Sequence, residues 1–71
     1  MANAIEQLLR QTDLTAYRLS KYTGVSPQAL HYQKKKEYNL KEAVNLATIL
    51  KEKGLIKKDL ILTENEIITK I

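Results

Sequence analysis

Cysteine is absent from this 71-residue chain, which excludes disulfides and cysteine-ligated metal sites. The reducing cytoplasm is the natural compartment for such a sequence. The chain has no apolar run long enough to span a bilayer, and its N-terminus lacks the pattern of a signal peptide. The sequence therefore predicts a soluble, cytoplasmic protein without a membrane partner.

Groups that could support catalysis are equally scarce. The chain has one histidine, His31, and no acidic pair in a setting that would raise a pKa. Its two glycines, Gly24 and Gly54, are both explained as helix stops, so no phosphate-cradling loop is present. His31 has no nearby second ligand of the usual kind. We expect no enzyme activity, no metal site and no cofactor.

The length fits a single small domain with a modest core. We expect residues 1–54 to form the main part of this domain and residues 55–71 a packing or dimerisation extension of it. Association with a second copy would bury the apolar surface that so small a core leaves exposed. A homodimer is therefore one hypothesis for this chain.

The most informative pattern lies in residues 14–33, which predict a short helix, a glycine turn and a second helix. Thr15 can cap the first helix, and Gly24 supplies the left-handed backbone conformation that ends it. Ser26 can cap the second helix, and Pro27 suits its first position. An apolar residue before each cap can pack on one five residues later, in the pairs Leu14 with Leu19 and Val25 with Leu30.

Two capping boxes mark the starts of two further helices, at Asn3 with Glu6 and at Asn39 with Glu42. The first of these helices is expected over about residues 4 to 11, and the last stops at Gly54. The apolar stripe of the last helix is wider than three short helices require. We expect the C-terminal tail or a partner to cover it.

The tail after Gly54 is open to two interpretations. Its β-branched residues favour a hairpin with strands at about 60–63 and 66–70. Thr63 and Glu66 instead form a further capping box, and the isoleucines that follow have helical spacing. The hairpin is slightly favoured, and either form must pack on the last helix or on another subunit.

Over about residues 3 to 53 the chain resembles the lambda-repressor-like family of helix-turn-helix proteins, which includes the phage Cro proteins. The residues that match in order and spacing are Leu19, Ser20, Gly24, Val25, Ser26 and Leu30. The resemblance implies a mainly α, four-helix domain with a short C-terminal hairpin or helix. It also implies a DNA-binding transcriptional regulator of phage or plasmid Cro or repressor type, with a recognition helix of about 27–35 in the major groove of a double-stranded operator.

The net charge of +4 is confined to one part of the chain. Residues 1–36 carry six basic and two acidic side chains, six minus two, whereas the remainder balances six against six. A surface that faces phosphates needs such a local excess. For Lys34, Lys35 and Lys36 alone, a solvated helix end that complements the helix dipole is an equal alternative.

The resemblance implies that the first, second and sixth residues of the recognition helix read bases, and these are Pro27, Gln28 and Tyr32. Pro27 has no side-chain donor, whereas Gln28 can bond adenine. Tyr32 or His31 could bond a base edge, touch a thymine methyl or reach a phosphate. The candidate phosphate contacts are Tyr17, Lys21, Ser26 and Lys35.

A second interpretation is a protein-binding module on the same fold. The family often has a phosphate-contacting glutamine where this chain has Ala16. An aromatic recognition helix without that glutamine suits an antirepressor that modulates a companion repressor by direct contact. DNA-binding regulation is favoured over this alternative because of the localised charge.

Overall fold

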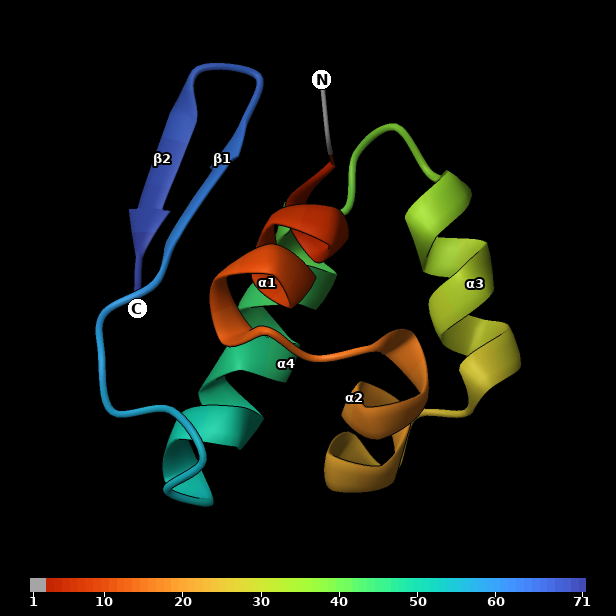
Figure 1. Ribbon diagram of the computed structural model, residues 1–71. Coiled ribbons are helices and arrows are strands. Elements are labelled where there is room, and N and C mark those ends of the chain that lie inside the picture. Colours follow the sequence, from red (N-terminus) through yellow and green to blue (C-terminus); the bar gives the residue numbers. More distant parts are fainter. Residues whose placement is uncertain (1–2) are drawn as a thin grey trace.

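The computed structural model describes residues 3–71, which form four helices and one two-stranded antiparallel sheet (Figure 1). The elements are α1 (Ala4–Thr12), α2 (Ala16–Thr23), α3 (Pro27–Lys35), α4 (Leu40–Glu52), β1 (Ile61–Glu64) and β2 (Ile67–Lys70). The mainly α architecture with a C-terminal hairpin is confirmed, and the alternative of a helical tail is wrong. Within the described part of the chain, no helix has the length and apolar character needed to cross a membrane.

The first three helices begin where local capping chemistry places them. The side-chain oxygens of Asn3, Thr15 and Ser26 each accept a hydrogen bond from the backbone N–H three residues later. Helix α2 ends at Gly24, whose φ of 79° lies in the left-handed region. The caps and the stop predicted for α2 and α3 are therefore confirmed.

The start of α4 differs from the expectation. Asn39 makes no side-chain capping bond to its own helix, so the predicted box with Glu42 is wrong. The carboxylate of Glu64 on β1 instead accepts hydrogen bonds from the backbone N–H groups of Asn39 and Leu40. The amide of Asn39 is buried and bonds to other elements, so a remote acidic side chain caps the helix in its place.

The end of α4 agrees with the expected stop at Gly54. This glycine has a φ of 75°, and its N–H donates to the carbonyl of Lys51. The N–H of Leu55 reaches back to the carbonyl of Leu50, at an N···O distance of 3.0 Å. Together these two bonds form the Schellman motif that commonly ends helices at glycine.

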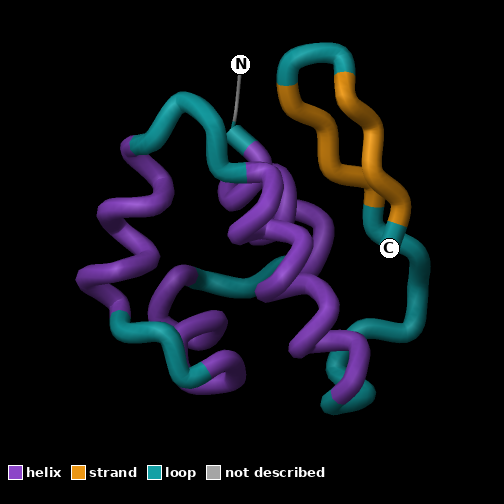
Figure 2. Tube along the Cα trace, turned by 180° about the vertical axis from the view of Figure 1, so that it is seen from behind, coloured by secondary structure: helices purple, strands orange, loops and turns teal. Residues whose placement is uncertain are grey.

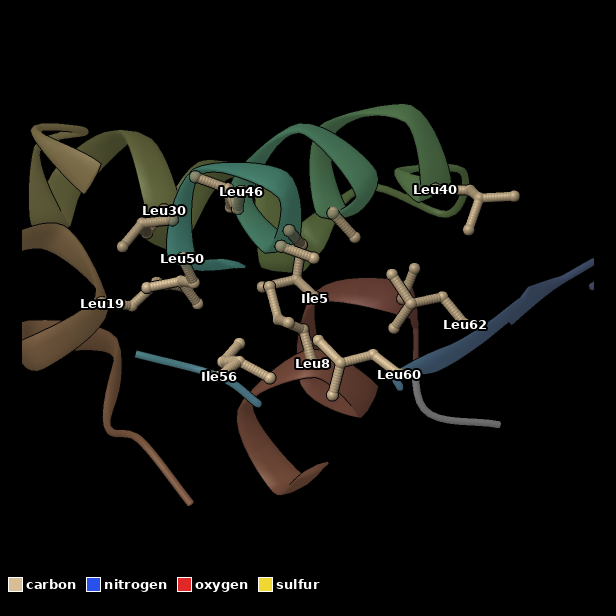
Figure 3. Packing of buried hydrophobic residues seen from close by; sticks show 13 residues of the cluster. Ile5, Leu8, Leu19, Leu30, Leu40, Leu46, Leu50, Ile56, Leu60 and Leu62 are labelled. Carbon is tan, nitrogen blue, oxygen red and sulfur yellow. The ribbon is translucent and has the colours of Figure 1, made fainter. Parts of the chain in front are cut away.

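The tail covers the wide apolar stripe of α4 within the monomer. Leu62 of β1 and Leu60, directly before this strand, are fully buried beside Ile5 and Leu8 of α1, and α4 lies across them (Figure 3). Leu46 of α4 is buried in the same cluster. The described residues thus form one core to which the tail contributes.

The hairpin has a tight two-residue turn at Asn65 and Glu66. Both residues have positive φ, 46° and 72°, as a type I′ turn requires. The strand pairs are Ile61 with Lys70, Leu62 with Thr69, Thr63 with Ile68, and Glu64 with Ile67. Both strands begin one residue later than the sequence predicts.

Two glutamines of α1 hold the free edge of β1. The amide of Gln11 accepts from the N–H of Ile61 at 3.0 Å and donates to its carbonyl at 2.7 Å. Gln7 makes the same pair of bonds with the backbone of Thr63, both at 2.9 Å. Because the side chains substitute for a neighbouring strand, β1 is paired along both edges.

The hairpin and α3 lie on opposite sides of the α1–α4 pair. Figures 1 and 2 view the molecule from front and back, and both show this separation. Strand β1 packs against α1 and α4, whereas α3 packs chiefly against α2. One side of the molecule is therefore built around the hairpin and the other presents α3.

Candidate nucleic-acid interface

Helix α3 is held to the core through one buried side chain. Leu30 is fully buried and belongs to the same apolar cluster as Leu19 of α2 (Figure 3). Val25, in the turn before α3, packs against the edge of this cluster. The rest of the nine-residue helix is exposed or half-buried. Most of its surface is therefore available to a ligand.

The structure brings the three candidate base-reading residues to the open surface of α3. Gln28, His31 and Tyr32 are all exposed, and the Tyr32 side chain retains 62% of its accessible area. Leu30 of the same helix is buried, so these three residues lie outside the core. None of the three side chains is needed to fill the core, so the fold does not explain their presence.

The four candidate phosphate contacts are exposed as well. Tyr17 and Lys21 lie on α2, Ser26 caps α3, and Lys35 lies in its last turn. The Ser26 hydroxyl oxygen accepts from the N–H of Ala29 at 3.1 Å, which leaves its own hydrogen free to be donated. The seven candidates thus occupy adjoining helices of one helix-turn-helix unit.

Two tyrosine–lysine pairs provide a feature that the sequence reasoning missed. The ammonium nitrogen of Lys21 lies 4.7 Å from the ring centroid of Tyr17, and that of Lys36 lies 4.9 Å from the ring centroid of Tyr32. Such contacts hold the cation over the aromatic face. In both pairs the lysine follows the tyrosine by four residues, a spacing visible in the sequence that brings two side chains together on a helix. The second pair adds Lys36 to the candidate surface.

Other parts of the described chain offer weaker sites. Nowhere in residues 3–71 do three His, Cys, Asp or Glu side chains gather so that they could hold a metal ion. A groove of about 670 Å³ opens between the start of α1, the α3–α4 connection and the hairpin turn. Its walls mix lysines with glutamates, which favours no single class of ligand.

The chain matches no protein-family model, no curated protein and no solved structure. Function is therefore inferred from the surface of α2 and α3 itself.

Proposed function

We propose that this protein is a sequence-specific DNA-binding transcriptional regulator of the lambda-repressor-like class, of phage or plasmid Cro or repressor type. One observation carries the proposal. Helix α3 follows a tight turn after α2, is anchored by Leu30, and leaves Gln28, His31 and Tyr32 exposed. A helix placed in this way can enter the major groove of DNA.

Each class of side chain on this surface has a separate task in the proposal. The amide of Gln28 can form two hydrogen bonds with N6 and N7 of adenine, and Tyr32 can contact a thymine methyl or a base edge. Phosphates are contacted by Tyr17, Lys21, Ser26 and Lys35, all of which are exposed. The phosphate contacts supply affinity, whereas Gln28 and Tyr32 supply most of the discrimination between sequences.

Titration of labelled DNA from the protein's own operon at several salt concentrations tests the proposal. A regulator binds one site in the presence of competitor DNA, and its affinity falls steeply with salt because bound counterions are released. Weak binding without sequence preference contradicts the proposal. It would favour the antirepressor alternative, in which the same face of α3 contacts a companion repressor protein.

Two substitutions connect that binding to α3. Gln28→Ala and Tyr32→Ala should each weaken specific binding by about 10- to 100-fold, which corresponds to the discrimination of one good base contact. Both side chains are exposed, so the helical circular dichroism should not change. Asn45→Ala, at an exposed position of α4, is the matched control and should bind as the original chain does. Unfolding of both α3 variants would mean that these side chains belong to the core.

A homodimer through β2 belongs to the same proposal. Leu60 and Ile71 exchange both backbone hydrogen bonds at the base of the hairpin, so Ile68 and Lys70 turn their backbone groups away from β1. No third strand of the described residues covers this edge. The side chain of Ile68 is 72% exposed. A second copy pairing antiparallel about Ile68 would place each Glu66 opposite Lys70 of the other copy.

Sedimentation tests this dimer. The original chain should be dimeric at high concentration, and Ile68→Lys should be monomeric with unchanged helical content, because lysine on an edge strand opposes pairing. A dimer would also place two recognition helices on half-sites about one helical turn apart. A monomer at high concentration in the original chain would remove the dimer from the proposal.

A further inference from the structure

The C-terminal end of α3 is fixed by two asparagines from other elements. The last carbonyls of a helix lack their usual partners four residues later, and that of Gln33 accepts from the N–H of Lys36 at 3.1 Å instead. The side-chain amide of Asn39 donates to the carbonyl of Gln33 at 2.8 Å, and that of Asn3 donates to the carbonyl of Lys34. Both acceptors lie in the last turn of α3.

Asn39 connects α3 with three other elements. Its side-chain oxygen accepts from the backbone N–H of Ala4 at the start of α1, at 3.0 Å. Its own backbone N–H donates to Glu64 on β1, which also caps α4. The residue is only 3% exposed, so these bonds are shielded from competing water.

The weak apolar anchorage of α3 makes these bonds decisive for its orientation. Leu30 is the only residue of this helix buried in the core, and Val25 before the helix packs against the edge of the same cluster. Both apolar contacts lie in or before the first half of the helix, so neither fixes its C-terminal end. The asparagine bonds fix that end. The position of Tyr32 relative to α2 then depends on the asparagine bonds as well as on Leu30.

We propose that Asn39 is a positioning residue for α3, which sets the tilt of the helix and so the placement of the DNA-reading side chains. The DNA part of this inference rests on the proposed function. The structural part concerns the orientation of α3 in the free protein and does not depend on any ligand.

Asn39→Ala tests both parts, with Asn45→Ala as the control on the same helix. Residual dipolar couplings should show α3 reoriented relative to α1 and α4, while α1 and α4 keep their mutual orientation. The affinity for operon DNA, measured where the variant is fully folded, should fall by about tenfold, the factor that one well-made hydrogen bond can supply. Lower thermal stability with unchanged couplings and affinity would make Asn39 merely structural and would overturn the proposal.

Asn39→Asp provides a second variant in case Asn39→Ala does not fold. Aspartate keeps the oxygen that accepts from Ala4 but removes the amide donor to Gln33. The couplings of the last turn of α3 should change in the same direction. Unchanged couplings in this variant would then decide against the proposal. If the original chain binds no DNA, the proposed function fails, whereas the couplings still decide whether Asn39 orients α3.

Discussion

Helix α3 and the hairpin are both surface elements, but they are attached to the core in different ways. Helix α3 has one buried side chain, Leu30, and two hydrogen bonds at its far end. The hairpin inserts Leu60 and Leu62 into the core and is held along its β1 edge by Gln7 and Gln11. The hairpin therefore serves the stability of the domain, whereas α3 exposes more of its surface than the fold requires. An exposed polar and aromatic face of this kind points to binding.

Truncation of the buried anchors should have the largest effect on stability. Leu30→Ala and Leu60→Ala each remove a fully buried side chain, and each should lower the free energy of unfolding by about 2–5 kcal/mol. Urea denaturation followed by circular dichroism measures this loss. A change below about 1 kcal/mol in either variant would show that its element is not anchored through that leucine.

The glutamine pairing of β1 should contribute less. Gln11→Ala removes two hydrogen bonds to the backbone of Ile61, but water can replace them at this exposed edge, so the expected loss is about 1 kcal/mol. Gln28→Ala, which removes a glutamine from the exposed face of α3, should leave the denaturation midpoint unchanged. Equal midpoints for the two variants would mean that the hairpin edge is not stabilised by α1.

The hairpin turn offers a gain in stability. Glu66 has a φ of 72°, a conformation that glycine adopts without the steric cost of a Cβ atom. Glu66→Gly should therefore raise the free energy of unfolding by up to about 1 kcal/mol. Glu66→Ala keeps the Cβ and should bring no such gain. If both variants melt like the original chain, the turn carries no strain at this position.

The smallest effect is expected at the base of the hairpin. Asp59 lies 3.3 Å from the ammonium of Lys70 and 3.4 Å from that of Lys51, measured from nitrogen to carboxylate oxygen. Hydrogen bonds and charge from Lys70, and then from Lys51, lower the pKa of Asp59 below its ordinary value of 3.8. A lowered pKa in the folded state means that the stabilisation is present above the unfolded pKa and is lost as the pH falls through the folded pKa.

Thermal melts of Asp59→Asn check this pair of contacts. The variant should melt slightly below the original chain at neutral pH, and the difference should shrink at acidic pH and in high salt, because exposed ion pairs are screened. A difference that grows as the pH falls would contradict the assigned role of the two lysines.

Local chemistry explains which parts of this fold could be predicted from the sequence. Thr15, Gly24 and Ser26 act on backbone groups within a few residues, so their positions define α2 and α3 without knowledge of the rest of the chain. Asn39 carries the same capping signal, but its amide bonds to Ala4 and Gln33. Contacts with segments remote in the sequence therefore decide whether such a residue caps its own helix, and the local sequence does not show them.

The hairpin shows the same limit. Residues 60–71 carry both strand and helix patterns, and their burial on α1 and α4 favours the strands. Gln7 and Gln11 look like ordinary surface residues until β1 lies beside them. For the candidate site, the sequence predicted seven side chains that the structure places on the open surface of α2, α3 and the turn between them. Lys36 was predicted only as part of a charged run, because the run does not show that its ammonium lies over the Tyr32 ring.

Amide chemical-shift mapping tests the central claim, that the open face of α3 binds DNA. The nitrogen-15-labelled protein is titrated at low salt with a mixed-sequence duplex of about two helical turns, to which a DNA-binding domain attaches non-specifically through the same face. The largest shifts are expected from residues 28–36 and the start of α2, with the buried residues of β1 unchanged. Shifts confined to the hairpin or α4, with α3 silent, would contradict this account.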